Sequence, residues 1–150
     1  MSVEFRNAVR DEFDFAAALL ARCDGPAKFH GHTEALLAAQ PQWLGKAQAF
    51  LDANGARIAK MNPVEGLKLT VRGVGMDKIM TARGMTPARI NACLASKSAQ
   101  TAVLGMTKEA FEVRQIGGTP AFIVNGTQLT NAGHWPVVEG SIKAALAVAK

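Results

Sequence analysis

Two cysteines and three histidines are the first candidates in this sequence for nucleophiles, redox groups or metal ligands. Cys23 and Cys93 lie far apart in the chain, so the sequence contains no Cys-x-x-Cys motif. A reactive thiolate is stabilised at the N-terminus of a helix, whereas Cys23 is predicted to lie at the C-terminal end of one. The two cysteines are therefore not predicted to be a catalytic pair, and no other catalytic residue is predicted.

The histidines do not form a pattern typical of a metal site. His30 and His32 are two positions apart, and such residues face opposite sides of a helix. His134 is distant in sequence and is predicted to lie in a loop, where a structural role is favoured over a role as general base. No metal ligand and no cofactor are predicted.

One stretch, residues 116–126, organises the rest of the chain. It combines a glycine-rich entry, a proline, a short apolar run and the pair Asn125-Gly126. An Asn-Gly pair next to an apolar run predicts a strand closed by a tight hairpin turn. Pro120 cannot donate a hydrogen bond within a sheet, so it is expected at the start of the strand or in a special turn, where a cis peptide bond is plausible.

This stretch resembles the cis-proline strand and hairpin of the DsbA-like, thioredoxin-fold disulfide oxidoreductases. Further segments resemble the helical insertion of that family, in the family's order. The resemblance covers most of residues 2–148 and is weak between Asn54 and Val74. The segments that carry it are Gly118–Gly126, Ala18–Cys23, Trp43, Gly84–Pro87 and Asn91–Leu94.

The resemblance implies roles for two pairs of residues. Members of the family can carry a second, non-catalytic disulfide at the places of Cys23 and Cys93, and the alternative is two buried free thiols. Closing about 70 residues with a bridge would stabilise the fold by roughly 4 kcal/mol in the chain-entropy model. Thr119 and Pro120 resemble the pair that binds an extended substrate segment through its backbone, and the alternative is a turn without a ligand.

The resemblance also shows what this sequence lacks. In the family, a first strand and a Cys-x-x-Cys motif precede the region that Val3–Arg6 resembles, so the chain is expected to be N-terminally incomplete. The missing strand would lie between residues 2–7 and the hairpin at 121–130, leaving strand edges that favour pairing. Self-association or binding of a complementary strand is therefore expected.

Composition and charge limit the function classes. The sequence has 150 residues, 49% of them hydrophobic and 19% charged, which is typical of a globular domain. Its net charge is +5, but the basic residues are scattered, so nucleic acid is not a predicted partner. No apolar run is long enough to span a bilayer, and residues 1–5 do not form a signal peptide. The family resemblance implies the periplasm; a genuine start at Met1 would imply the cytoplasm.

Hydrophobic periodicity and capping residues predict the elements. Asp14 is expected to cap the first helix, Pro41 to stop the second, and Asn54-Gly55 to break or kink the third. Thr86 and Pro87 predict the start of a further helix. The predicted helices span about 15–23, 28–40, 43–53, 77–83, 87–95, 97–115 and 135–149. The last of them has an apolar stripe from Val138 to Ala149. Strands are predicted at 3–6, 121–124 and 127–129.

The segment 61–85 gives the least regular pattern. Leu67, Leu69 and Val71 alternate with polar residues, which indicates a short extended piece within an irregular segment.

These observations predict an α/β, thioredoxin-like fold with a helical insertion. A single domain over 1–150 is expected, with the insertion at about 14–115 and a strand–hairpin–helix portion at about 116–149. The chain is interpreted as a fragment or divergent member of the protein thiol–disulfide oxidoreductases. It is expected to be inactive alone and to take an extended protein or peptide as its partner; the alternative is a non-catalytic peptide-binding or assembly module.

Overall fold

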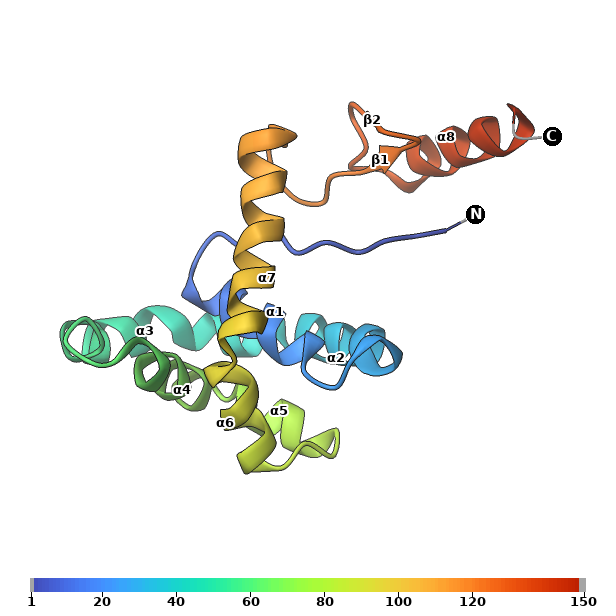
Figure 1. Cartoon of the computed structure of the whole chain (residues 1–150). Helices are drawn as coiled ribbons and strands as arrows, with labels where there is room; N and C mark the ends of the chain where they lie inside the picture. The colour runs from blue at the N-terminus through green and yellow to red at the C-terminus, as the bar shows by residue number, and fades with distance from the viewer. Residues whose placement is uncertain (1, 149–150) are drawn as a thin grey trace. The chain divides into compact units, whose positions relative to one another are not determined.

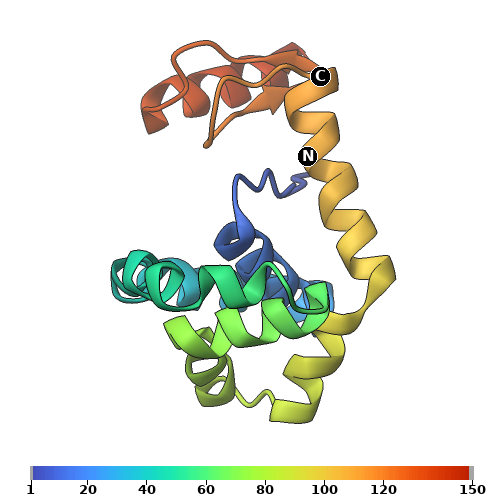
Figure 2. The ribbon, with the colours of Figure 1, turned by 90° about the vertical axis from the view of Figure 1, so that its left-hand side faces the viewer.

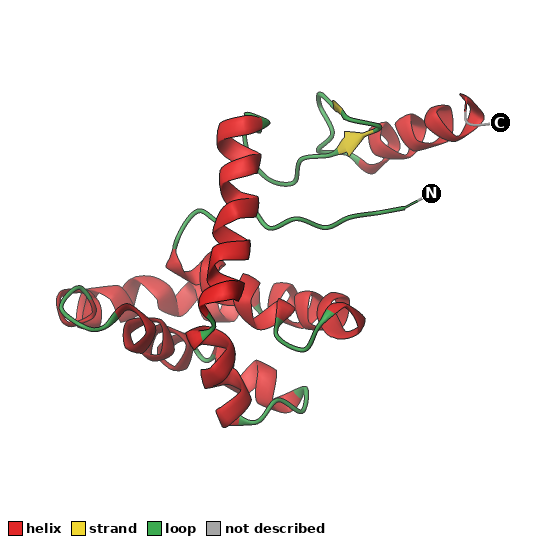
Figure 3. Cartoon of the chain, in the orientation of Figure 1, coloured by secondary structure: helices red, strands yellow, loops and turns green. Residues whose placement is uncertain are grey.

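The computed structural model describes residues 2–148 and divides the chain into two compact units. The helical unit is Val9–Met106. The hairpin unit combines Met1–Ala8 with Thr107–Lys150. Most of the described chain is helical, and its two strands are short (Figures 1 and 3).

The helical unit is built from consecutive helices joined by short turns (Figure 2). The first, α1, contacts α2, α4 and α6, and the fourth, α4, contacts α1, α3, α5 and α6. The bounds are α1 Glu12–Arg22, α2 Pro26–Ala38, α3 Gln40–Ile58, α4 Pro63–Val74, α5 Met76–Ala82, α6 Pro87–Ala95 and α7 Lys97–Lys108, whose last residues lie in the hairpin unit.

The start of α1 is set by Asp11. Its side chain accepts hydrogen bonds from the backbone amides of Phe13 and Asp14 at 2.9 and 2.8 Å. The prediction that Asp14 caps this helix was wrong, because Asp11 is the residue whose carboxylate reaches the free amides of the first turn.

The second and third helices differ from their predicted bounds because of where prolines are tolerated. Pro41 lies in the first turn of α3, where the missing amide is unpaired in any helix. It therefore begins α3 and does not stop α2, contrary to the prediction. The pair Asn54-Gly55 does not break α3, which continues to Ile58, and the Asn54 side chain donates to the Phe50 carbonyl one turn back at 3.0 Å.

The segment 61–85 is helical, so the predicted extended piece was wrong. Asn62 caps α4 by accepting from the Val64 amide at 3.0 Å, and Pro63 occupies its first turn. Leu67 and Val71 are one helical turn apart and face the core, which accounts for their spacing as well as a strand would.

The core of the helical unit receives side chains from all seven of its helices, α1 to α7. Its largest fully buried side chains are Leu19, Leu20, Met76, Met80 and Leu94. The two methionines are completely buried, so they fill the core and do not line a surface groove.

The hairpin unit contains the π-helix η1 (Glu109–Val113), strands β1 (Ile123–Val124) and β2 (Thr127–Gln128), and α8 (Trp135–Val148). The strands form a two-stranded antiparallel sheet. Thus the predicted helix 97–115 ends as η1. Ala149, the last residue of the predicted apolar stripe, lies outside the described residues.

Residues 2–10 contain no strand, contrary to the prediction for Val3–Arg6. The alternation of apolar and polar residues is present, but a strand requires a hydrogen-bonded neighbour and the described chain places none beside it. Arg6 instead forms ion pairs with Glu4 and with Glu109 of η1.

None of the helices within residues 2–148 has the length and apolar character needed to cross a bilayer.

Candidate functional site

The approach to β1 carries the predicted substrate-binding pair. Thr119 and Pro120 are exposed, and the peptide bond between them is cis. Three residues later the chain enters β1, which turns back through Asn125 and Gly126, both with positive φ (48° and 84°). This is the two-residue turn typical of Asn-Gly hairpins, so the sequence predicted the hairpin correctly.

The hairpin is short and its pairing is fully specified. Ile123 pairs with Gln128, and Val124 pairs with Thr127. One further backbone bond joins the Leu129 amide to the Phe122 carbonyl at 2.8 Å. Within residues 2–148, no hydrogen bond reaches the backbone of Thr119. The chain before β1 therefore presents backbone groups that an extended segment could use.

The segment that leads into β1 and the hairpin after it contain no side chain with a formal charge. From Gln115 to Val138 the sequence contains no Asp, Glu, Lys or Arg. Charged side chains, especially lysines, are what normally prevent a strand edge from pairing with another chain. The hairpin lacks this protection.

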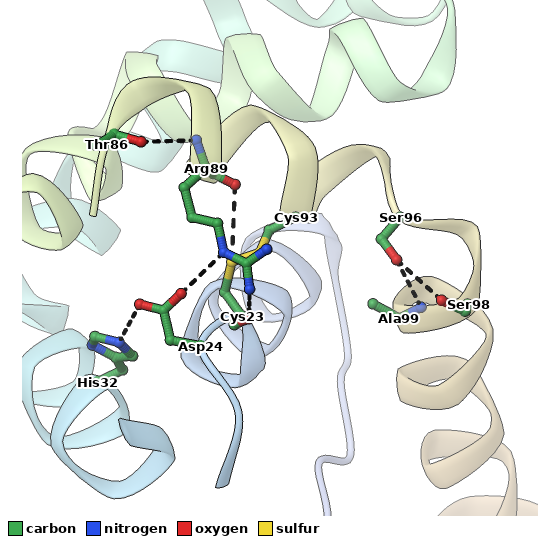
Figure 4. The surroundings of a disulfide bond; sticks show 9 residues. All are labelled: Cys23, Asp24, His32, Thr86, Arg89, Cys93, Ser96, Ser98 and Ala99. Atoms are coloured by element: carbon green, nitrogen blue, oxygen red, sulfur yellow. Dashed lines mark hydrogen bonds and ion pairs between the residues drawn. A yellow bond between two sulfur atoms is a disulfide. The ribbon is translucent and has the colours of Figure 1, made fainter. Parts of the chain in front are cut away.

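The second candidate site is the disulfide between Cys23 and Cys93 in the helical unit (Figure 4). The bond joins the residue that ends α1 to the inner face of α6, with the two Cα atoms 5.6 Å apart and 70 positions between the residues. The predicted bridge is confirmed. The alternative of two free thiols is not observed.

A chain of polar side chains adjoins the disulfide (Figure 4). Arg89 of α6 donates to the backbone carbonyl of Cys23, and its Nε lies 3.0 Å from Oδ1 of Asp24. The other carboxylate oxygen of Asp24 lies 3.4 Å from Nε2 of His32. Arg83 Nε donates to His32 Nδ1 at 3.1 Å. We call Arg83, His32, Asp24 and Arg89 the polar relay.

The relay fixes the orientation of its histidine ring. His32 is buried, with 1% of its surface exposed. An arginine can only donate, so Nδ1 of His32 accepts from Arg83, and Nε2 on the other side of the ring faces Asp24. His32 is therefore held by the relay and is not oriented for a metal ion.

The pKa of the Asp24 carboxyl is lowered below its ordinary value of 3.8, chiefly by the hydrogen bond from Arg89 and further by the one from His32, while partial burial opposes the shift. Asp24 is thus a carboxylate in the folded protein at neutral pH. Its charge balances the arginine that reaches the end of α1.

The sequence-predicted residues fall into different units. Cys23 and Cys93 come together in the helical unit, whereas Thr119 and Pro120 belong to the hairpin unit. His134 lies in the turn before α8 and is exposed, as predicted.

The polar relay was missed by the sequence analysis. Asp24 directly follows Cys23, and Arg89 precedes Cys93 by four positions, which places Arg89 and Cys93 on one face of a helix. Opposite charges next to two cysteines expected to pair are the signal that could have identified it. His32 and Arg83 gave no such signal, because they join the relay only through the packing of α2 against α5.

A family model described as thioredoxin matches residues 2–144. The chain belongs to this thioredoxin family. Structural comparison matches the crystal structure of a protein-disulfide isomerase from Novosphingobium aromaticivorans, with 27% sequence identity and a TM-score of 0.82. The match covers 94% of this chain and 72% of that chain. A comparison with curated protein sequences gives no match.

These findings confirm the resemblance to the DsbA-like, thioredoxin-fold disulfide oxidoreductases and the predicted fold class. This thioredoxin-family chain is mostly helical within its described residues, with a small sheet.

Proposed function

We propose that this chain is the substrate-docking and scaffold portion of a protein disulfide oxidoreductase. It binds an extended segment of a protein along the approach to β1, with Thr119 and Pro120 as the contact residues. The single observation that carries the proposal is an exposed, uncharged approach to a strand in a fold similar to a solved protein-disulfide isomerase.

The chemistry of the family requires a cysteine pair. A thiolate attacks one sulfur of a substrate disulfide, a mixed disulfide forms, and the second cysteine displaces the substrate as a thiolate. The 150 residues contain no Cys-x-x-Cys. The chain alone is therefore expected to dock substrates without exchanging their disulfides.

Two assays test the two halves of this proposal. Reduction of insulin disulfides by dithiothreitol, followed with and without the chain, is expected to show no acceleration. Binding is followed by the NMR amide signals of Thr119 and Ala121 during titration with a reduced, carboxymethylated and therefore unfolded protein. These signals are expected to shift.

A matched pair of variants places the binding at the strand edge. Ile123 and Gln128 are cross-strand partners, with Ile123 on β1 and Gln128 on β2. A lysine on the edge that accepts a new strand opposes pairing. Ile123→Lys is expected to abolish the shifts and Gln128→Lys to retain them. Acceleration of insulin reduction by the chain alone, or equal binding by both variants, would contradict the proposal.

A second candidate function, an assembly module, is favoured by the exposed apolar surface of the hairpin unit. Its exposed large apolar side chains include Val3, Phe5, Val113, Ile123, Trp135, Val137, Leu146 and Val148. Apolar surface next to an unprotected strand edge favours association with a second copy or a complementary strand. Sedimentation velocity over a range of concentrations tests this. A rising mass supports assembly, and a monomer at every concentration excludes self-association.

The disulfide and the family together favour an oxidising compartment such as the periplasm for this protein. Alkylation of the protein in intact cells, followed by mass measurement, tests this location. Two alkylated thiols would contradict it.

A further inference from the structure

We propose that the Cys23–Cys93 disulfide is a reversible redox couple whose reduced form stays folded, because Arg89 and the polar relay hold the two cysteine-bearing segments together without the covalent bond. The couple would be a redox centre separate from any Cys-x-x-Cys pair.

Arg89 repeats, with hydrogen bonds, the connection that the disulfide makes covalently. It belongs to α6, as Cys93 does, and it reaches the end of α1, where Cys23 lies. Its guanidinium donates both to the Cys23 carbonyl and to the Asp24 carboxylate. A cation at the last carbonyls of a helix satisfies an unpaired acceptor and matches the helix dipole. Both bonds remain possible when the sulfurs separate.

The far end of the relay keeps Asp24 in place. The Asp24 carboxylate is held through His32 of α2, and His32 is held by Arg83, which directly follows α5. Gly31 makes room for this arrangement, because a Cβ atom at that position would lie 2.6 Å from Nη2 of Arg83. The carboxylate that receives Arg89 is thus positioned by two elements that carry no cysteine.

The apolar core holds the same helices. Leu20 of α1 and Leu94 of α6 have 0% of their surface exposed, and Ile90 of α6 has 3% exposed. These side chains belong to one buried cluster. Opening the disulfide removes none of these contacts.

The redox step uses a low-molecular-weight thiol as reductant. Cys23 is partly exposed, whereas Cys93 has 8% of its surface exposed, so the thiolate attacks the Cys23 sulfur. A bond forms between the sulfur of the small-molecule thiol and the Cys23 sulfur, and the Cys23–Cys93 bond breaks. Cys93 leaves as a thiolate that takes a proton from solvent. A second thiol then releases Cys23 and forms the oxidised small-molecule disulfide. Two electrons pass from two thiols to the protein, and the reverse sequence recloses the bond.

Equilibration with defined ratios of reduced and oxidised glutathione tests the proposal. Acid quenching, alkylation and intact-mass measurement give the fractions of reduced and oxidised protein at each glutathione ratio. These fractions give the effective concentration of the two thiols, which measures how readily the protein disulfide forms relative to that of glutathione. In the unchanged protein, far-ultraviolet circular dichroism is expected to show the same helix content before and after reduction. Arg89→Ala is expected to lower the effective concentration about tenfold, the scale of one charge-assisted hydrogen bond.

Arg72→Ala is the matched control. Arg72 also reaches α6 from another helix, with its Nη2 3.4 Å from the side-chain oxygen of Asn91, but it contacts neither cysteine. This variant is expected to leave the effective concentration unchanged. Arg89→Lys retains the charge without the forked donor and is expected to fall between the two.

Two results would overturn the proposal. Loss of helix on reduction of the unchanged protein would show that the disulfide is needed for folding. Equal effective concentrations in Arg89→Ala and Arg72→Ala would show that the relay does not hold the thiols. If Arg89→Ala does not fold in its oxidised form, the comparison is made with Arg89→Lys and Asp24→Asn, and the absence of any decrease in both would overturn it equally.

Discussion

The helical unit and the hairpin unit differ in how completely they bury their own apolar side chains. The helical unit contains the buried core cluster, in which several large side chains are wholly inaccessible. In the described part of the hairpin unit, only Ile116, Ala132 and Val138 are buried hydrophobic residues. Most of the exposed large apolar side chains in residues 2–148 belong to the hairpin unit.

The difference follows from the hydrogen bonding of the two kinds of element. A helix satisfies its backbone internally, so a group of helices needs only matching apolar faces to form a core. A strand must pair with a neighbouring strand to satisfy its backbone, and an isolated two-stranded hairpin is marginally stable in water. The helical unit is complete with its own residues, whereas the hairpin unit has edges and apolar surface available to a partner.

The largest expected difference between the units is in how much free energy of unfolding is lost when a leucine is replaced by alanine. Leu94 of α6 is fully buried, whereas Leu146 of α8 is 45% exposed. Leu94→Ala should lower the free energy of unfolding by about 3 kcal/mol, and Leu146→Ala by less than about 0.5 kcal/mol. Urea unfolding followed by circular dichroism measures both. Equal losses would mean that the two units bury their surfaces alike.

A pair of glycines tests how tightly the helices of the helical unit are packed. A Cβ atom at Gly73 of α4 would lie 2.1 Å from the ring of Phe50 in α3, whereas one at Gly45 of α3 would meet nothing within 4 Å. Gly73→Ala should destabilise the protein by about 1–3 kcal/mol through this clash. Gly45→Ala should stabilise it by about 0.5–1 kcal/mol, because alanine favours the helix.

Thermal or urea unfolding of these two variants separates the effects. A stabilising Gly73→Ala would show that Phe50 moves aside easily and that the contact between α3 and α4 is loose.

The polar relay predicts a pH dependence for the helical unit. The folded pKa of Asp24 lies below its ordinary value of 3.8, so its charge stabilises the fold above 3.8, and this contribution is lost as the pH falls through the folded pKa. The stability advantage of the unchanged protein over Asp24→Asn should therefore be larger at neutral pH than at an acidic pH well below 3.8. Urea unfolding at both pH values measures it.

Asp52→Asn serves as the control for this prediction. The Asp52 carboxylate accepts from the uncharged side chain of Gln48 at 2.7 Å and has no basic partner among the described residues. Its substitution should cost less stability at neutral pH than Asp24→Asn does. An advantage over Asp24→Asn that is the same at both pH values would contradict the stabilising role of the Asp24 charge.

The smallest expected effect is a difference in fluorescence between the two tryptophans, one in each unit. Trp43 of α3 has 3% of its surface exposed and donates to the Leu36 carbonyl at 2.9 Å, while Trp135 at the start of α8 is 64% exposed. The fluorescence that remains in Trp135→Phe should be blue-shifted and poorly quenched by acrylamide. In Trp43→Phe it should be red-shifted and readily quenched. Weak quenching of Trp135 would show that a partner or a second copy covers the hairpin unit.

Local signals in the sequence predicted the elements whose ends are set by neighbouring residues. Thr86 caps α6 by accepting from the Arg89 amide at 3.2 Å, with Pro87 in the first turn, as predicted. The Asn125-Gly126 turn is also confirmed, because positive φ angles in a two-residue hairpin demand such residues. These features depend on a few adjacent residues, so the sequence suffices to place them.

Predictions failed where a pattern fits two structures. Alternating apolar residues in 67–71 satisfy a strand and also one face of a helix, and the cap at Asn62 with Pro63 was the signal that favoured a helix. Val3 and Phe5 were predicted to lie in a strand, and their pattern fits no helix. No strand forms there, because the described chain supplies no neighbouring strand to pair with it.

The sequence by itself determined the hairpin and the capped start of α6, because each depends on residue types close together in the chain. It also determined the family, through several short segments that follow one another in the family's order. The pairing of Cys23 with Cys93 was implied by family resemblance and is confirmed by the structure. Only the tertiary structure decided that Arg89, Asp24, His32 and Arg83 form one relay beside that bond. Their contacts join residues 24–32 to residues 83–89, two stretches distant in sequence, and the packing of α1, α2, α5 and α6 around a common core brings these stretches within hydrogen-bond distance.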